Sequence, residues 1–283
     1  MLALLVSAKI KKNVVFDSTL MVGRQNLFFK EKDLKEIFNF FNLKVNRCSH
    51  IFEEDLPFAE ELFEKLGAHT VHSIDASNYE NATFIYDLNF PIKDKIAPIY
   101  DVVIDSGTLE HIFNTPQAIK STSDLVRLNG FYVGIFPCNN FFGHGFYQFS
   151  SEFFFRLFTN QNGFELLDVI IFIDENNPVF YKVSDTSENF QRIQFTNTKP
   201  VYIYVLAKRI NRNHLFSEYP QQNDYSNYKW KGNRIKTNSK KHKKFKNSIP
   251  VYFKNLTKAL LNRPLRQEKI NFEKPYFTEY KLK

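Results

Sequence analysis

Residues 100–114 read YDVVIDSGTLEHIFN, and the rest of the expected fold can be built outward from them. Tyr100 and residues 102–104 are aromatic or β-branched, so they suit a buried strand that runs into an acid and a glycine at Asp105 and Gly107. This pattern is typical of a central parallel strand reaching the edge of its sheet, where open α/β sheets bind their ligands. His111 would then lie beside that edge, with a side chain able to titrate near neutral pH.

Strands and helices alternate over most of the chain. The expected strands are short β-branched or aromatic runs at residues 18–22, 69–74, 83–86, 100–104, 131–136, 166–173 and 201–208. The expected helices lie at residues 31–42, 56–66, 116–128 and 151–161. This order predicts an α/β fold with a doubly wound, mostly parallel, seven-stranded Rossmann-like sheet. No helical pattern separates the last two strands, so we expect an antiparallel last strand, with the polar loop 174–199 forming part of a lid or an edge.

Composition favours a reducing compartment. Cys48 and Cys138 are the only cysteines, too few for a disulfide framework or a cysteine metal site. No apolar run approaches the roughly 20 residues of a membrane span. Residues 1–6 are apolar but short, and lysines follow them rather than precede them, which is the wrong order for a signal peptide. We expect a cytoplasmic protein, with peripheral contact to a membrane as an option.

Charge divides the chain into two parts. Residues 210–283 contain 18 Lys and Arg against 5 Asp and Glu, whereas residues 1–209 contain 20 against 25. We therefore expect a slightly acidic domain at residues 1–209 and a basic, aromatic-containing C-terminal extension at residues 210–283.

Four short motifs follow four of the expected strands. They are Gly23-Arg24-Gln25, Asp75-Ala76, Asp87-Leu88 and Asp105-Ser106-Gly107. In this order, and followed by a terminal β-hairpin, they resemble the class I S-adenosylmethionine-dependent methyltransferases over about residues 15–208. The resemblance implies a Rossmann-like fold, S-adenosylmethionine as cofactor and S-adenosylhomocysteine as product.

The resemblance implies a role for each motif. Asp75 would accept hydrogen bonds from the ribose hydroxyls, with Ala76 beside it; the alternative is a turn acid. Asp87 would meet the adenine edge and Leu88 its ring, although a plain turn aspartate is also open. Asp105, Ser106 and Gly107 would line the methionine part of the cofactor.

The first motif departs from the family pattern. The family has a glycine-rich loop after an acid, whereas this chain has Gly23 alone, followed by Arg24 and Gln25. Gly23 is the residue type required where the backbone passes close to a ligand or takes a positive φ. Arg24 could pair with the cofactor carboxylate as a fork. The alternative is a fold that no longer binds cofactor.

Two histidines are candidate bases for an acceptor hydroxyl. His111 is the first, although it could merely shape the site. His144 is the second; it lies in the loop 138–150 between glycines that leave its imidazole accessible. The same loop supplies polar groups for an acceptor at Asn139, Asn140, Tyr147 and Gln148.

That mixture of amides and aromatic rings suits a sugar or other polyol, so O-methylation of a sugar or polysaccharide precursor is expected. The loop also resembles one in methyltransferases of bacterial surface-glycan clusters. An ordinary aromatic-rich loop packed on the sheet is the alternative. Metal is not indicated: Asp105, Glu110, His111 and His144 could form a site, but no ligand pair of fixed spacing such as H-E-x-x-H is present.

The basic extension has three possible partners. Its clusters at Trp230–Arg234 and Ser239–Lys246, and a short expected helix at Asn255–Asn262, interleave charge with aromatic residues. They suit an anionic membrane surface or a polyanion, and nucleic acid less well because no RNA-binding module accompanies them. A solvated extension is the bland alternative. An RNA methyltransferase guided by the extension and a catalytically inactive binding protein remain rival functions, and the oligomeric state is not defined by the sequence.

Overall fold

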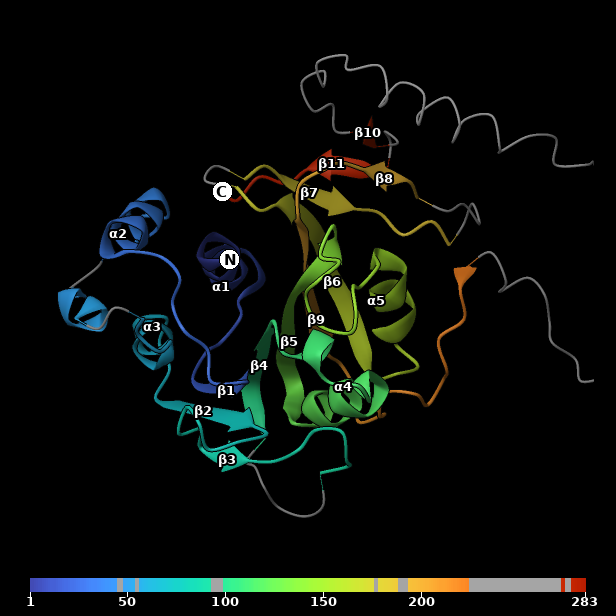
Figure 1. The fold of residues 1–283 in the computed structure, drawn as a ribbon, viewed down its shortest axis with the longest axis horizontal. Helices are drawn as coiled ribbons and strands as arrows, with labels where there is room; N and C mark the ends of the chain where they lie inside the picture. The colour runs from blue at the N-terminus through green and yellow to red at the C-terminus, as the bar shows by residue number, and fades with distance from the viewer. Residues whose placement is uncertain are drawn as a thin grey trace, which may run out of the picture.

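The computed structural model describes residues 1–44, 48–53, 56–92, 99–175, 178–187, 193–223, 271–272 and 276–283. Within these residues, a nine-stranded sheet has the order β11-β7-β6-β9-β5-β4-β1-β2-β3 (Figure 1). Its strands are β1 (Ser18–Val22), β2 (Thr70–Asp75), β3 (Phe84–Ile85), β4 (Tyr100–Ser106), β5 (Val126–Asn139), β6 (Phe164–Ile173), β7 (Phe180–Val183), β9 (Val201–Arg209) and β11 (Phe277–Glu279). Strands β8 (Phe195–Thr196) and β10 (Asn271–Phe272) form a separate antiparallel pair.

The sheet has a parallel core and antiparallel strands on one side. Strands β3, β2, β1, β4 and β5 pair in parallel, whereas β9 pairs antiparallel with both β5 and β6. The expected α/β fold with its antiparallel hairpin at β6 and β9 is therefore confirmed. The sheet is wider than the seven strands predicted, because β7 falls within the predicted loop 174–199 and β11 within the predicted extension. At four and three residues, both strands are too short for a period-two pattern to identify.

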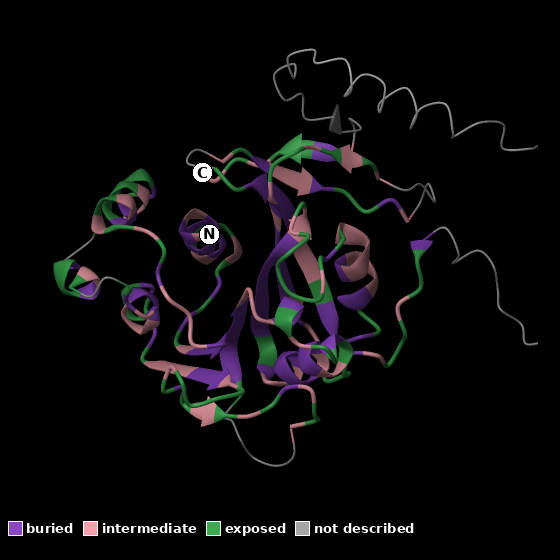
Figure 2. Ribbon diagram, in the orientation of Figure 1, coloured by how far each residue is buried: buried purple, intermediate pink, exposed green. Residues whose placement is uncertain are grey.

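Helices cover both faces of the sheet (Figure 1). One face packs against α1 (Leu2–Lys12), α2 (Glu31–Phe40) and α3 (Glu60–Lys65), and the other against α4 (Thr115–Asp124) and α5 (Ser151–Leu157). Successive strand residues alternate between these faces: Val103 packs in the core under α4 and α5, and Ile104 in the core under α1. Figure 2 shows the buried residues running along the central strands between these two layers.

Several helices are shorter than expected, for identifiable reasons. The side-chain nitrogen of Asn162 donates to the carbonyl oxygen of Leu157 over 3.0 Å, which satisfies a free carbonyl at the end of α5. Helix α4 stops at Asp124 because β5 already begins at Val126. Residues 1–17, for which no helix was predicted, contain α1, in which Leu5 and Val6 are fully buried.

The described C-terminal residues return to the sheet and to the first helix. The amide nitrogen of Tyr280 donates to the carbonyl oxygen of Phe180 over 2.7 Å, and Ser7 Oγ of α1 donates to the carbonyl oxygen of Leu282 over 3.0 Å. The basic clusters Trp230–Arg234 and Ser239–Lys246 and the expected helix Asn255–Asn262 lie outside the described residues. No helix in the described part of the chain is long and apolar enough to cross a membrane.

Candidate functional site

The four motif-bearing strand ends meet at one edge of the sheet. Val22, at the end of β1, pairs in register with Ile74 of β2 on one side and with Asp105 of β4 on the other. Asp75 pairs with Ile85 of β3, and its carbonyl oxygen accepts the amide of Tyr86 over 2.7 Å. The structure therefore brings Gly23, Asp75, Asp87 and the Asp105 segment to the same carboxyl edge.

Gly23 allows the end of β1 to approach the loop after β4. Its φ is +73°, and a Cβ atom built there would lie 2.6 Å from Oγ1 of Thr108. That hydroxyl donates to the carbonyl oxygen of Val22 over 2.7 Å, so it ties the two strand ends together. A side chain at residue 23 would displace this contact, and the single glycine of the first motif is therefore required here. Thr108 directly follows the fourth motif, and the sequence pattern predicted no role for it.

Gln25 fills the space between the ends of β1 and β4. Its side-chain nitrogen donates to the carbonyl oxygens of Val22 and Ile104, over 3.3 and 3.5 Å. Its Oε1 atom is buried and has no hydrogen-bond partner among the described residues. A buried acceptor without a donor is costly, so this atom is suited to accept from a ligand.

Arg24 is bound within the protein. Its Nε atom donates to Oε1 of Glu60 and one terminal nitrogen donates to the carbonyl oxygen of Glu80, both over 2.7 Å. The guanidinium also stacks 3.8 Å from the ring centroid of Phe58. A hollow of about 460 Å³ adjoins these groups and is lined also by His50 and Glu61. A bidentate grip on a ligand carboxylate through Nε and a terminal nitrogen would require Arg24 to release Glu60.

Asp75 and Asp87 both occupy turns. Oδ1 of Asp75 accepts the amide of Ser77 over 3.1 Å, and Oδ1 of Asp87 accepts the amide of Asn89 over 2.9 Å. These are the turn contacts that the bland interpretation of each acid predicts. They use one oxygen of each carboxylate, so the other oxygen can still accept from a ligand. Ala76 is exposed and Leu88 is buried.

Asp105 is fully buried at the end of β4. Its Oδ1 accepts the amide of Thr108 over 2.9 Å, and its Oδ2 has no partner among the described residues. Burial, followed by the neighbouring charge of Glu110, raises the pKa of Asp105 well above its usual range. The adjacent Ser106 hydroxyl donates to the sulfur of Met1 over 2.9 Å, and Gly107 has a φ of +99°. At Ser106 the chain's own side chain lies where cofactor was expected.

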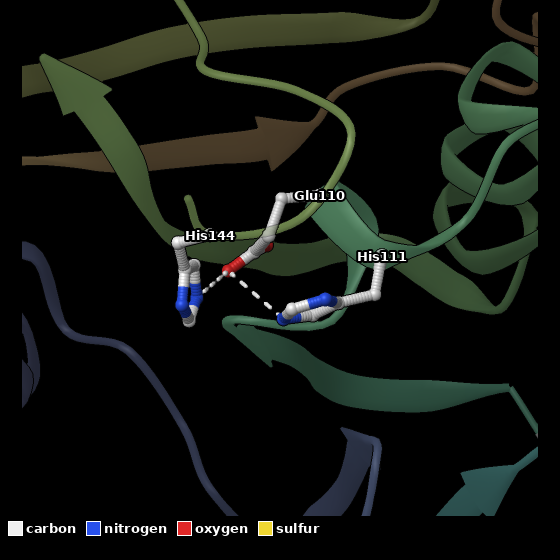
Figure 3. A group of neighbouring side chains, drawn as sticks. All are labelled: Glu110, His111 and His144. Atoms are coloured by element: carbon white, nitrogen blue, oxygen red, sulfur yellow. Dashed lines mark ion pairs between the residues drawn. The ribbon is translucent and has the colours of Figure 1, made fainter. Parts of the chain in front are cut away.

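Glu110, His111 and His144 form a cluster beside this edge (Figure 3). Glu110 and His111 belong to the short helix η2 (Leu109–His111), and His144 comes from the loop after β5. Oε1 of Glu110 lies 3.5 Å from Nε2 of His144 and 4.0 Å from Nε2 of His111, and the imidazole centroids are 4.9 Å apart. The structure therefore brings both candidate bases together around a third residue, Glu110.

Burial governs the ionisation of this cluster. Glu110 is 1% exposed, and burial raises its pKa although the charge of His144 acts in the opposite direction. Burial, and then the charge of His144, lowers the pKa of His111. Glu110 received no functional role from the sequence except as one of four conceivable ligands, because its closeness to His144 depends on the path of a distant loop.

The polar residues predicted to bind an acceptor form hydrogen bonds within the protein that stabilise the loop 138–150. Asn139 and Asn140 donate through their side-chain nitrogens to Asn197 Oδ1 over 3.1 and 2.9 Å. Oε1 of Gln148 accepts the amide of Phe141 over 2.9 Å, and the Tyr147 hydroxyl donates to the carbonyl oxygen of Phe113 over 2.8 Å.

Exposed aromatic rings surround the loop; the rings within it were predicted as acceptor contacts only as a group, and Phe113 was missed. Phe113 and Phe146 contact each other edge to face with centroids 5.8 Å apart, and both are exposed. Phe142 is fully exposed two residues before His144. Neighbouring exposed rings such as these are candidates for contact with a ligand.

A scan against protein-family models and a search of curated proteins both gave no match. Solved structures align over most of the chain. A proposed methyltransferase from Bacillus halodurans has 10% identity and a TM-score of 0.39, covering 73% of this chain and 98% of its own. An S-adenosylmethionine-dependent methyltransferase from Clostridium acetobutylicum has 10% identity and a TM-score of 0.31, covering 74% and 91%. One from Aquifex aeolicus has 11% identity and a TM-score of 0.29, covering 71% and 88%. These similarities are too remote to establish chemistry.

Proposed function

We propose that this protein is an S-adenosylmethionine-dependent methyltransferase that methylates a hydroxyl group of a sugar or other polyol. The observation that carries the proposal is the meeting of Gly23, Asp75 and Asp105 at one sheet edge, with two histidines beside it. Ligands of open α/β sheets bind at such an edge. The order of the motifs along the sequence supports the same cofactor.

The residues at the edge fit S-adenosylmethionine. The buried Oε1 of Gln25, which has no partner among the described residues, would accept from the ammonium group. The second oxygen of Asp75 would accept from the ribose hydroxyls. Asp87 and Leu88 would meet the adenine. Gly23, Asp105 and Gly107 would line the methionine part; Ser106 would join them on releasing Met1, and Arg24 on releasing Glu60 or Glu80. These assignments are proposals.

When bound, S-adenosylmethionine supplies an electrophilic methyl group on a sulfonium. The chain then has two tasks, to orient the acceptor hydroxyl and to receive its proton. His111 and His144 each carry an Nε2 atom beside the edge and are half exposed, so an acceptor can reach them. One of them would take the proton, with Glu110 stabilising the resulting imidazolium.

The loop after β5 supports a polyol acceptor. Phe113, Phe142 and Phe146 offer exposed ring faces for the C–H surface of a sugar. Asn139 and Asn140 use their side-chain nitrogens within the protein, so their oxygens can accept from acceptor hydroxyls. Together these groups provide the apolar and polar contacts that such a ring requires.

Calorimetric titration of the full chain with S-adenosylhomocysteine tests the proposal. We expect saturable binding at micromolar to sub-millimolar ligand. No heat at millimolar ligand would refute the function.

One observation favours a second candidate, a cofactor-free binding protein with the same fold. Gln25, Arg24 and Ser106 all bond to the protein's own atoms at the edge where cofactor would lie. If these contacts are permanent, the protein binds no nucleoside at this edge. The same titration separates the two candidates, because only the methyltransferase predicts heat.

A further inference from the structure

We propose that Glu110, His111 and His144 form a binding site for one divalent transition-metal cation of the Zn²⁺ class. Each residue offers one ligand atom, and these atoms all lie within 4.8 Å of one another (Figure 3). Two imidazoles and one carboxylate form a common donor set for zinc in sites that keep a coordination position open.

The separations of the donor atoms match ligands of one ion better than hydrogen bonds. Oε1 of Glu110 is 3.5 Å from Nε2 of His144 and 4.0 Å from Nε2 of His111. A good N–H···O hydrogen bond is about 2.9 Å long, so neither imidazole bonds the carboxylate well. Two ligands at about 2.1 Å from a tetrahedral ion lie about 3.4 Å apart. Small side-chain rotations would therefore bring all three donors to coordination distance.

One oxygen of the buried Glu110 carboxylate lacks a partner among the described residues. Glu110 is 1% exposed, and its Oε2 atom is buried without a hydrogen-bond partner in the described part of the chain. A buried carboxylate whose contacts are long on one oxygen and missing on the other is unfavourable unless a cation compensates it. A cation bound by Oε1 would compensate that charge directly, and Oε2 could join it as a second oxygen ligand.

The backbone fixes the three ligands before any ion binds. The amide of Phe146 donates to the carbonyl oxygen of Glu110 over 2.7 Å, which joins the His144 loop to η2. Gly145 has a φ of +70°, and the amide of His144 donates to the carbonyl oxygen of Phe141 over 3.0 Å. Ligands on a preorganised backbone bind with less loss of conformational entropy.

The site also leaves room for further ligands. The side chains of His111 and His144 are 49% and 48% exposed, in contrast to Glu110. A cation held between them would face solvent, with remaining positions for water or for oxygens of an acceptor. That last role rests on the proposed function, whereas cation binding does not. With the ion bound, both Nε2 atoms would be ligands, so neither histidine would act as the base. A hydroxyl coordinated to the ion would instead lose its proton to solvent water, because the cation lowers the pKa of that hydroxyl.

The test is a titration of the full chain, after EDTA has removed bound metal, with two ions. Visible absorption measures Co²⁺ binding and calorimetry measures Zn²⁺ binding. We expect one equivalent of either ion to bind, with Zn²⁺ displacing Co²⁺. His111→Ala and His144→Ala should each weaken Zn²⁺ binding by roughly 100-fold, since even outer contacts of metal ligands are worth about 10- to 100-fold. Glu110→Gln, which keeps the side-chain shape, should weaken Zn²⁺ binding by the same factor. A thermal melting curve of this variant checks that it is folded.

His50→Ala is the matched control, because His50 also faces a carboxylate: its Nε2 lies 2.6 Å from Oε2 of Glu61. Among the described residues, this pair belongs to no group of three possible metal ligands. It should bind Zn²⁺ as the wild type does. The proposal is overturned if Co²⁺ does not saturate a single site, or if His144→Ala and wild type bind Zn²⁺ equally. None of these measurements uses S-adenosylmethionine or an acceptor, so a failed S-adenosylhomocysteine titration would leave their outcome intact. In a protein that does bind S-adenosylhomocysteine, EDTA should abolish methyl transfer, and Zn²⁺ restore it, without changing that binding.

Discussion

A Cβ atom added to Gly145 would lie 2.7 Å from the carbonyl oxygen of Glu110. The loop that carries His144 thus reaches Glu110 through a residue that has no side chain, and with a φ of +70° that a side chain would disfavour. The cluster of Figure 3 depends on this contact as much as on the three side chains themselves.

Gly145→Ala should separate His144 from Glu110. We expect weaker Zn²⁺ binding, lower activity and a loss of about 1–2 kcal/mol in the free energy of unfolding, the typical cost of a left-handed backbone with a Cβ. Calorimetry and urea unfolding measure the two effects. Gly143→Ala is the control in the same loop, since a Cβ there meets no atom within 4 Å. Equal effects of the two substitutions would contradict the prediction.

Asp75→Ala should weaken S-adenosylhomocysteine binding by about 10-fold or more, because hydrogen bonds to a charged group are worth about 1.5–3 kcal/mol. The proposed contact is between ribose hydroxyls and the oxygen not used by Ser77. Calorimetry measures the change. Glu165→Gln, an exposed substitution at the opposite end of the sheet, should leave the affinity unchanged. Unaltered affinity in Asp75→Ala would assign this acid to the turn alone.

Glu60→Gln should strengthen binding of S-adenosylhomocysteine several-fold, because it weakens the hold of Glu60 on Nε of Arg24 and frees the guanidinium for the ligand's carboxylate. Methylthioadenosine has the same nucleoside but no amino acid carboxylate, so its affinity should stay constant. Competition calorimetry with both ligands provides the comparison. A parallel change for the two ligands would mean that Arg24 only supports the fold near Phe58.

Protonation of Asp101 should make the folded protein less stable in acid. Burial alone would raise the pKa of Asp101, but hydrogen bonds from the Ser18 hydroxyl and amide and from Arg127 outweigh it, so its pKa lies below the usual value. A carboxylate whose pKa is depressed on folding contributes stability above its unfolded pKa, about 3.9, and that contribution is lost as the pH falls through the lower folded value.

Asp101→Asn should therefore cost about 1–3 kcal/mol at pH 7, since it removes the buried charge that these donors contact, and less near pH 3. Urea unfolding at both pH values gives the difference. Glu165→Gln again serves as the control, with a small effect at either pH. A cost for Asp101→Asn that does not shrink in acid would show that its charge is not what stabilises the fold.

The strand ends were predictable, whereas the contacts across them were not. Parallel strands such as β1 and β4 carry short apolar runs that end in glycine or an acid. These runs, and the resemblance that their motifs carry, predicted that Gly23, Asp75 and Asp105 share an edge. By contrast, the bonds of Gln25 and Arg24 to the protein's own atoms depend on side-chain positions that no local pattern encodes.

Irregular segments account for the other differences. Strand β5 begins at Val126, five residues before the expected start, because Val126 already pairs with Tyr100 of β4. An irregularity then interrupts the pairing until Phe131. Asn129 takes a φ of +64° there, and the following glycine resembles the end of a helix in the sequence. The meeting of His144 with Glu110 was likewise beyond a sequence pattern, because it depends on the course of the whole loop 138–150.

The return of Phe277–Glu279 to the sheet changes what the basic stretch of the sequence can do. Asn223 on one side of residues 224–270 donates to Thr186, and β11 on the other pairs with β7, so both attachment points belong to the same folded body. The basic stretch of the sequence therefore connects two points of one folded body and is not a free C-terminal tail.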